Sequence, residues 1–431
     1  VLISGAGFLA DAYDLFVINI AVDLMERCNY TETLTTSTKT TLKSMAVAGA
    51  IVGQIGFGSI ADLIGRKRVF IATCSLVIIG AVLSGLVVHR DGKVFDIYTQ
   101  VSFWRFILGV GVGGEYPLSA AITTESSSSG HEIPNLALVF SMQGIGTLLC
   151  STTLVIITST MGEQYEYQWR LALLLGAAPM VIAFYFRWRM HETDIHRRIA
   201  SVSDNNTNEP PCLEALQHSI LHFQKGYKAI VHTVRLNYWN LLGTVGAWFL
   251  LDIVFYGNGL FSGQVTKSMR FAQSPRSEAV ASLFLQSIAL PGYFCSVLFA
   301  QVIGLRRLQL YGFTASASIF LILAVFQPLL VQVPTLYVLF YGFTFFAQNF
   351  GPNATTYIVP SLLFAAEHRG TCHGISAAAG KLGALLGAQV FLHVVNSFCA
   401  AQTCTSSSPP GDINAGLQLT FLTCCAVCVA G

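Results

Sequence analysis

The stretch WRFILGVGVGGEYPLSAAI, residues 104–122, raises the question that decides the fold. Gly109, Gly111 and Gly114 match the G-x-G-x-x-G spacing of a dinucleotide-binding turn, which follows a strand and opens a helix in a soluble unit. Here the glycines lie inside a long apolar run that also contains Glu115. Small residues at such spacing let helix backbones approach closely within lipid. The stretch therefore predicts a membrane helix with buried charge and argues against a nucleotide cofactor.

The composition extends this interpretation to the whole chain. Hydrophobic residues make up 53% of the 431 residues and charged residues only 11%, whereas soluble domains carry about 25% charged residues. A soluble protein with so few charges could not cover its surface. The formal net charge of +2, without a basic stripe, argues against nucleic acid as a partner. The chain is thus predicted to be an all-α protein embedded in a lipid bilayer.

Twelve apolar segments are long enough to span about 30 Å of hydrocarbon, which takes roughly 20 residues each. They are residues 1–24, 41–62, 68–88, 98–122, 134–160, 168–187, 239–262, 277–304, 307–330, 335–362, 370–397 and 414–431. The long polar stretch 188–238 separates the sixth segment from the seventh. We therefore expect a six-helix half over 1–187, a linker over 188–238 and a second six-helix half over 239–431.

Basic residues predict how these segments are oriented. Loops after even-numbered segments carry thirteen Lys and Arg residues, with Arg187 counted among them, and loops after odd-numbered segments carry eight. Cytoplasmic loops of membrane proteins are enriched in Lys and Arg. Both termini and the linker are therefore predicted to lie in the cytoplasm. His218 and His222 share a helix face in the linker, but a zinc site needs more ligands, so no metal site is predicted.

The two halves repeat each other in sequence. GFLADAYDLF in the first segment aligns with WFLLDIVFYG in the seventh, which places Asp11 over Asp252. GQIGFGSIADLIGRKR aligns with GYFCSVLFAQVIGLRR, which places Gly65 over Gly304. A same-direction repeat indicates parallel halves related by an axis along the membrane normal, the arrangement of major facilitator transporters. Channels and receptors have no need of such a repeat.

Ionisable residues inside the apolar segments are the candidate functional residues. They are Asp11 and Asp14 in the first segment, Arg105 and Glu115 in the fourth, Asp252 in the seventh and Lys381 in the eleventh. Each costs roughly 2.5–3.5 kcal/mol at a helix centre, so they must face one another or a wet cavity. Ion pairs that only join helices are the alternative interpretation, above all for Arg105 and Asp14.

Neutral hydrogen-bonding groups accompany these charges. Trp248, Asp252 and Tyr256 are spaced i, i+4, i+8 and share one helix face. The sequence QNFGPNATT, residues 348–356, predicts a broken helix suited to binding at the membrane midplane. One cation, Lys381, among neutral donors indicates a compact oxyanion as ligand. An inside-negative membrane opposes anion uptake by roughly 2.3 kcal/mol per charge per 100 mV, so uptake needs a co-moving positive charge, which protonatable carboxyls can carry.

At these residues the chain resembles the fungal and plant phosphate:proton symporters of the major facilitator superfamily. GSIADLIGRKR is similar to the helix 2–3 motif of the superfamily, and GGEYPLSA, WFLLDIVFYGNGL and NFGPNATTYIVP with RGTCHGISAAAGKLGA are specific to the phosphate family. The resemblance implies phosphate contacts at Tyr116, Gln143, Trp248, Asp252, Tyr256, Asn353 and Lys381, a proton path at Asp11, Asp14 and Glu115 with Arg105 beside them, and a cytoplasmic gate at Asp62, Arg66 and Glu125.

The resemblance further implies a plasma-membrane transporter, with no enzymatic activity and no cofactor. Glu115 departs from the family, which usually has Asp in GGDYPLSA, and the additional methylene moves the carboxyl by one carbon–carbon bond. Carriers of glycerophosphodiesters are therefore the alternative substrate class, and a phosphate-sensing receptor is a third possibility. The lack of a cofactor motif argues against a membrane-bound oxidoreductase. The expected function is proton-coupled uptake of inorganic phosphate by alternating access.

Overall fold

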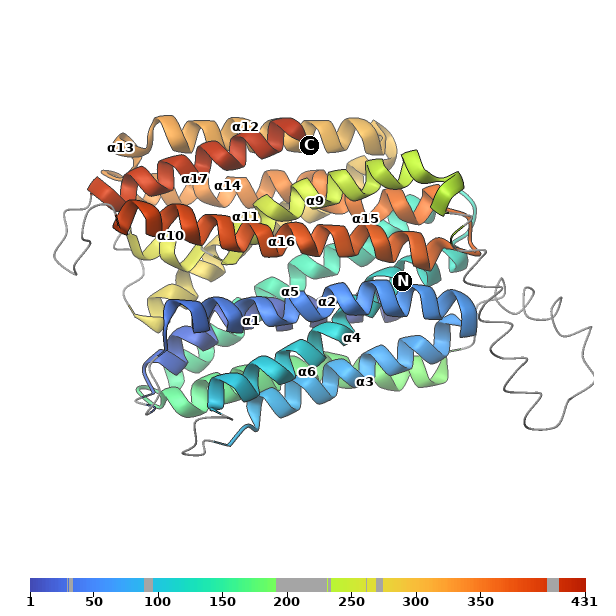
Figure 1. Cartoon of the computed structure of the whole chain (residues 1–431), viewed down its shortest axis with the longest axis horizontal. Helices are drawn as coiled ribbons and strands as arrows, with labels where there is room; N and C mark the ends of the chain where they lie inside the picture. The colour runs from blue at the N-terminus through green and yellow to red at the C-terminus, as the bar shows by residue number, and fades with distance from the viewer. Residues whose placement is uncertain are drawn as a thin grey trace, which may run out of the picture.

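The computed structural model describes residues 1–28, 30, 34–88, 96–190, 231, 234–260, 262–268, 274–400 and 411–431. In these ranges the secondary structure is helical throughout (Figure 1). The helices before the linker are α1 (Leu2–Glu26), α2 (Thr36–Ile64), α3 (Arg66–Gly85), α4 (Ile97–Ser126), α5 (Glu132–Thr160) and α6 (Tyr165–Arg189). His218 and His222 lie outside the described residues.

The helices after the linker complete the fold. They are α9 (Tyr238–Leu260), α10 (Ser262–Ser268), α11 (Pro275–Ile303), α12 (Leu305–Val325), α13 (Gln327–Leu330), α14 (Pro334–Phe350), α15 (Pro352–Leu363), α16 (Arg369–Ala400) and α17 (Gly411–Ala430). A described helix lies over each of the twelve predicted segments, and two segments, 307–330 and 335–362, are each covered by two helices. Within the described residues, eight helices are each long and apolar enough to cross a membrane, namely α2 to α6, α9, α11 and α12.

Two groups of helices lie side by side (Figure 1). The N-terminal group consists of α1 to α6, and the C-terminal group consists of α9 to α17. The groups meet mainly where α2 packs against α16 and where α5 packs against α11. Large apolar side chains such as Trp239, Leu298 and Val302 remain exposed on the outer surface, as expected of helices that face lipid. This arrangement puts the polar face of each group along the boundary between them.

The glycines of the opening stretch pack helices together. A Cβ atom at Gly109 would lie 2.0 Å from the Ala46 carbonyl oxygen, and one at Gly113 would lie 2.2 Å from that of Ala50. At both positions the backbone of α4 approaches that of α2 so closely that no side chain would fit between them. The expectation that these glycines allow close helix approach is confirmed.

Glycine also forms sharp corners at two positions that the repeat aligned. Gly65, between α2 and α3, has φ 107°, and Gly304, between α11 and α12, has φ 89°. A positive φ is readily adopted only by glycine, so the chain turns sharply from one helix into the next at both positions. The two aligned glycines therefore have the same structural role in the two groups.

The predicted break in the tenth segment is confirmed. α14 ends at Phe350 and α15 begins at Pro352, with Gly351 between them at φ −145°, ψ −74°. Proline lacks an amide hydrogen and disfavours the helical conformation of the residue before it. Gly351 also lies so close to α12 that a Cβ atom would be 2.2 Å from the Leu308 carbonyl oxygen. At the break, Ser296 Oγ donates to the carbonyl oxygens of Asn349 and Phe350 at 2.7 Å. α15 begins one residue before Asn353.

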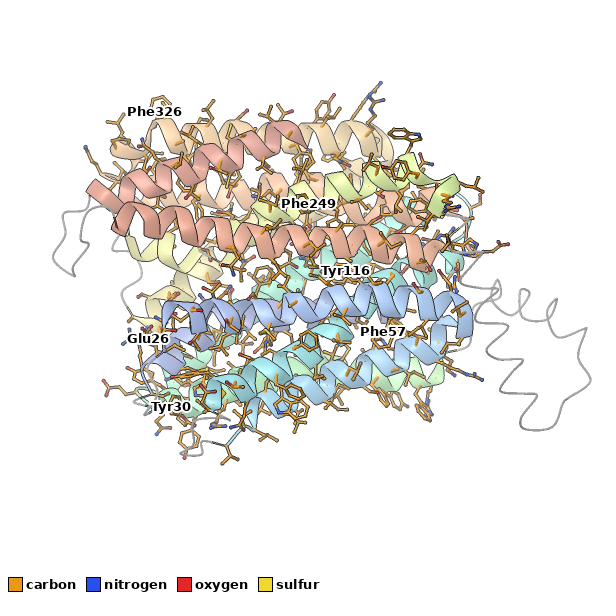
Figure 2. All side chains as sticks on the ribbon, in the orientation of Figure 1. Glu26, Tyr30, Phe57, Tyr116, Phe249 and Phe326 are labelled. Atoms are coloured by element: carbon orange, nitrogen blue, oxygen red, sulfur yellow. The ribbon has the colours of Figure 1, made fainter. Side chains whose placement is uncertain are left out.

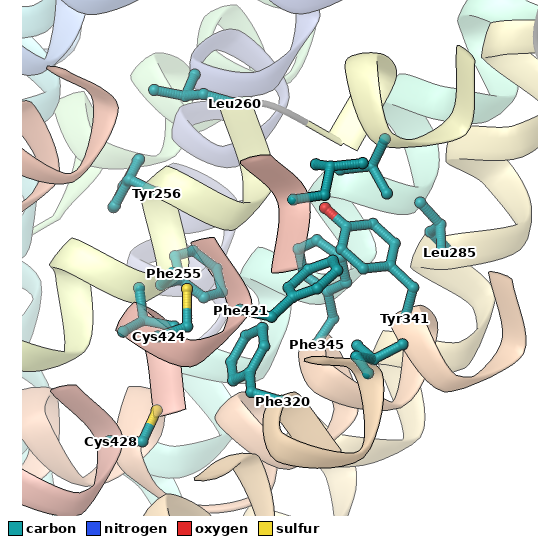
Figure 3. Packing of buried hydrophobic residues seen from close by; sticks show 14 of the residues in the cluster. Phe255, Tyr256, Leu260, Leu285, Phe320, Tyr341, Phe345, Phe421, Cys424 and Cys428 are labelled. Carbon is teal, nitrogen blue, oxygen red and sulfur yellow. The ribbon is translucent and has the colours of Figure 1, made fainter. Parts of the chain in front are cut away.

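Aromatic side chains fill the core of the C-terminal group. Phe320, Tyr341, Phe345 and Phe421 pack together with the buried Cys424 (Figure 3). The Phe320 and Phe421 rings are stacked with centroids 6.1 Å apart. The described cysteines are all free, and the described residues contain no cluster that could hold a metal ion. This rigid apolar core fixes α9 and α16, the helices that carry the central charged pair.

Candidate functional site

A buried ion pair lies at the boundary between the two groups. Lys381 Nζ on α16 donates to Asp252 Oδ2 on α9 over 2.8 Å, and both side chains are 2% exposed. The Lys381 ammonium also lies 4.3 Å from the centroid of the Tyr256 ring and 5.2 Å from that of Tyr116. Tyr116 belongs to α4 of the N-terminal group and points toward the boundary (Figure 2). Both groups of helices thus contribute to the surroundings of one cation.

The helix face predicted from spacing forms one wall of this site. Trp248, Asp252 and Tyr256 are all buried on α9, and the Trp248 side chain interacts with the Asp252 carboxylate. Gly380 precedes Lys381, and a Cβ atom at that position would lie 2.4 Å from Trp248 Cδ1. The glycine therefore lets the indole reach the base of the lysine. Tyr256 donates no hydrogen bond to any described residue.

The other predicted contact residues lie on α5 and α15. Gln143 is 2% exposed, and its Oε1 accepts no hydrogen bond from the described part of the chain. Asn353 is also buried, and its Nδ2 donates to Asn349 Oδ1 over 2.7 Å. Tyr293 on α11 interacts with both asparagine amides, and it packs on Gly144, where a Cβ atom would be 2.5 Å from the ring. Tyr293 thus connects the Gln143 and Asn353 regions.

A layer of rings adjoins the site and was not found in the sequence. Phe8 packs on Tyr116 and Tyr357 with centroids 4.8 and 5.0 Å apart. His373 lies edge-on to Tyr357 at 5.3 Å and to Trp248 at 5.4 Å. The His373 side chain is fully buried on α16, eight residues before Lys381 and so on the same helix face. A search for every ionisable residue inside the apolar segments would have found it.

The side chains of Asp11 and Asp14 on α1 are buried, and their carboxylate oxygens accept no hydrogen bond from a described residue. Asp11 is 1% and Asp14 0% exposed. Arg105 Nη2 donates to the main-chain oxygen of Asp14, and its charge acts on the Asp14 carboxyl. Arg105 therefore accompanies Asp14 on the α1 side of α4.

The hydrogen-bonded partner of Glu115 is Arg187, which the sequence had assigned to a loop. Arg187 Nη1 and Nη2 each donate to one Glu115 carboxylate oxygen over 2.6 Å, and both side chains are fully buried. By its sequence Arg187 counts among the loop residues, although it also ends the predicted segment 168–187. The structure places it inside α6, which continues to Arg189. A charge in the last turn of an apolar run has the same sequence pattern whether it faces water or a buried acid.

The predicted gate residues form a clasp between the groups. Asp62 Oδ2 accepts hydrogen bonds from Thr371 N at 2.7 Å and Thr371 Oγ1 at 2.8 Å. Arg66 donates to the Ala366 carbonyl oxygen at 2.8 Å and to Glu125 at 3.2 Å. We call the end of the bundle where this clasp lies the Asp62 end. Arg66 and Glu125 belong to the N-terminal group, so the clasp ties that group to the α15–α16 connection.

Close backbone contact reinforces this closure. A Cβ atom at Gly58 on α2 would lie 2.5 Å from the Gly370 carbonyl oxygen, and one at Gly374 on α16 would lie 2.2 Å from that of Gln54. On the other side of the central pair, away from the Asp62 end, a cavity of about 30 Å³ lies between the groups. Its polar lining residues are Asn19, Lys43, Thr147, Ser151, Ser262, Thr266, Glu278, Ser282 and Gln286.

Comparison with known proteins identifies the family. Residues 1–430 match the family of the sugar (and other) transporters. The chain belongs to this transporter family. Among its curated relatives, the probable inorganic phosphate transporter 1-6 of Arabidopsis thaliana is 34% identical, with 98% of this chain and 90% of the relative aligned. The probable inorganic phosphate transporter 1-4 of Oryza sativa subsp. japonica is 33% identical, with 99% of this chain and 87% of the relative aligned.

Solved structures confirm the fold. The major facilitator superfamily proton:xylose symporter XylE, bound to 6-bromo-6-deoxy-D-glucose, superposes on the chain with a TM-score of 0.75 at 16% identity, over 99% of this chain and 93% of XylE. The transporter therefore has the predicted all-α major facilitator fold. It is a multi-pass integral membrane protein, and its relatives are transporters rather than enzymes.

Proposed function

We propose that this transporter takes up inorganic phosphate together with protons by alternating access. The observation that carries the proposal is the buried Lys381–Asp252 pair, with Tyr116, Tyr256 and the Trp248 indole around it. A protonated phosphate anion needs donors for its oxygens and an acceptor for its hydroxyl groups. Lys381 supplies charge and a donor, and the phenols and indole supply further donors. The Asp252 carboxyl, protonated when the anion binds, supplies an acceptor for a phosphate hydroxyl and one more donor. The names of the relatives support the same substrate.

Gln143 and Asn353 are proposed to complete the phosphate shell. Both are buried amides, one from each group of helices, and each can donate and accept. The shell then joins α4 and α5 of the N-terminal group to α9, α15 and α16 of the C-terminal group. A substrate that contacts both groups lets them rock around it, which is the movement that alternating access requires. We infer that residues 1–187 and 239–431 are the two units that move and that 188–238 links them.

The charge bias of the loops indicates how the transporter is oriented in the membrane. We infer that the Asp62 end faces the cytoplasm, with both termini, and that the chain lies in the plasma membrane. The clasp of Asp62, Arg66 and Glu125 would then be the cytoplasmic gate. When the clasp is formed the site is closed toward the cytoplasm, and release requires the hydrogen bonds to Thr371 and Ala366 to break. Asp11, Asp14 and Glu115 would carry the protons.

Uptake of labelled phosphate into proteoliposomes is expected to rise as the outside is made acidic and to collapse with a protonophore. The reason is that the charges beside the site that can change are carboxyls, and a co-moving proton cancels the anion's charge against an inside-negative potential. The same vesicles with a sodium gradient and no pH gradient provide the control. Uptake that requires sodium and ignores pH would contradict the proton assignment, and binding without counterflow would indicate a receptor.

Excess glycerophosphoinositol is expected to compete poorly with labelled phosphate. The contact residues proposed here are each 5% exposed or less, and the rings of Tyr116 and Tyr256 lie close to the ammonium, so the shell suits a compact tetrahedral anion. A diester also has two fewer ionisable oxygens than inorganic phosphate, and its anion has no hydroxyl group to share with Asp252. Competition curves with phosphate and with the diester, at two pH values, make the comparison. Strong competition with uptake of labelled diester would assign the site to organic phosphates, and Glu115 would then be the first residue to substitute.

A further inference from the structure

We propose that Arg187 is a positioning residue for proton coupling, which exchanges its carboxylate partner between Glu115 and Asp11 as Asp11 gains and loses a proton. The inference rests on the proposed proton coupling and adds to it a cation that moves between two acids. It assigns the buried arginine of α6 a part in the transport cycle. In the structure Arg187 is bound to Glu115, so the other partner is Asp11.

The Arg187 side chain is fully buried. Besides its two hydrogen bonds to Glu115, the guanidinium lies 3.6 Å from the centroid of the Phe70 ring on α3. Thr73 Oγ1, on the same helix, donates to Glu115 Oε1 over 2.7 Å. A guanidinium matches a carboxylate with two parallel hydrogen bonds and stays charged at any physiological pH. The pair therefore ties the end of α6 to α3 and α4 and changes only if a second acid competes for the arginine.

Asp11 is that second acid. One turn before it on α1, a Cβ atom at Gly7 would lie 2.3 Å from Arg187 Nη2 and 2.6 Å from Glu115 Oε2. Gly7 thus places the backbone of α1 against the ion pair, and Asp11, at i+4, lies on the same helix face. Asp11 is buried, its oxygens accept no hydrogen bond from a described residue, and it interacts electrostatically with Glu115 and Arg187.

The charges that face Asp11 leave few alternatives to Arg187. They are Asp14 on α1, Cys74 on α3, Glu115 and Tyr116 on α4, Arg187 on α6 and Tyr256 on α9. Of these groups only Arg187 is a cation. Arg105, the next arginine, donates instead to the Asp14 main-chain oxygen. With Asp11 protonated, Glu115 and Arg187 balance each other.

Loss of the Asp11 proton changes this balance. The carboxyl O–H bond breaks, the proton passes to water on the side that is open at that stage, and two carboxylates then share one guanidinium. Ionised carboxylates close together in a low dielectric repel each other strongly. Arg187 relieves the repulsion by swinging toward Asp11, which weakens its bonds to Glu115 and its contact with Phe70. Proton release on α1 is thereby transmitted to the packing of α3, α4 and α6.

The test uses purified full-length protein in liposomes that contain a pH-sensitive dye. Proton flux and labelled phosphate uptake are measured together, and phosphate counterflow shows that each variant is folded. In Arg187→Gln we expect the number of protons moved per phosphate to fall about tenfold, within the usual range of coupling between two sites, and the pH dependence of uptake to flatten. Arg187→Lys keeps the charge without the bidentate geometry and should be intermediate. Arg189→Gln is the matched control, because Arg189 lies two residues after Arg187 on α6 and is exposed. This variant should couple like wild type.

The double variant Arg187→Gln/Glu115→Gln separates coupling from simple charge compensation. It leaves no unpaired charge at the pair, so folding is preserved, but it also leaves Asp11 without an arginine partner. Coupling in the double variant that stays below the coupling of Glu115→Gln alone supports the proposal, whereas coupling equal to that of Glu115→Gln alone would show that Arg187 only neutralises Glu115. Normal coupling in Arg187→Gln overturns the inference while leaving the proposed function intact. A wild-type protein that moves phosphate without protons overturns both.

Discussion

Lys381→Ala is expected to abolish phosphate binding. The substitution removes a buried cation that contacts Asp252, Tyr116 and Tyr256, and it leaves the Asp252 carboxylate uncompensated next to the incoming anion. Breaking a buried ion pair by removing one partner costs about 3–5 kcal/mol. A comparable loss of binding free energy weakens affinity by roughly two to four orders of magnitude. Equilibrium binding of labelled phosphate to the purified protein measures this directly.

Two further variants make the result specific. Lys39→Ala is the matched control, because Lys39 forms an ion pair with Glu26 whose side chains are 30% and 49% exposed, and exposed pairs contribute little. The double variant Lys381→Ala/Asp252→Asn removes both charges of the buried pair and should fold, yet still fail to bind. Phosphate binding by Lys381→Ala at wild-type affinity, or its recovery in the double variant, would show that the lysine serves only to compensate Asp252.

The features that sequence could predict are those fixed by local chemistry. The break at Gly351 follows from the proline after it, and the corners at Gly65 and Gly304 follow from glycine at matched positions of the repeat. The Lys381–Asp252 pair could be expected because charges inside apolar helices need partners, and few candidates exist. In each case one residue type makes any other backbone conformation or charge arrangement energetically costly, so the sequence pattern has one interpretation.

The remaining features depend on which helix faces meet. Arg187 stands near the end of an apolar run, and only the packing of α6 against α1, α3 and α4 decides that it faces Glu115 rather than water. Arg105 accompanies Asp14 for the same reason, since α4 presents Arg105 and Glu115 at different heights of α1. The ring layer brings Phe8 of α1 together with Tyr357 of α15 and His373 of α16, which are more than 300 residues away in the chain. No local sequence pattern predicts these contacts between side chains on different helices.

Asp252→Asn is expected to bind phosphate as wild type does, yet to lose net uptake by about two orders of magnitude or more, because an unpaired buried charge costs several kcal/mol. Asparagine retains a donor at the position where a protonated Asp252 would donate, so the loaded state is preserved. After release, however, Lys381 has no carboxylate to return to. The substrate-free transporter is then destabilised by an uncompensated ammonium and cannot complete its return step.

Exchange and net uptake separate this mechanism from a general loss of activity. Exchange of internal for external phosphate does not require the substrate-free transporter to reorient, so Asp252→Asn should still exchange while its net uptake is nearly absent. Glu26→Gln, at the surface far from the site, should leave both rates unchanged. Normal net uptake by Asp252→Asn would mean that Lys381 finds another counter-charge after release, and loss of binding would mean that the carboxylate itself holds the substrate. Either result would contradict the mechanism in which Lys381 pairs with phosphate in the loaded transporter and with Asp252 after release.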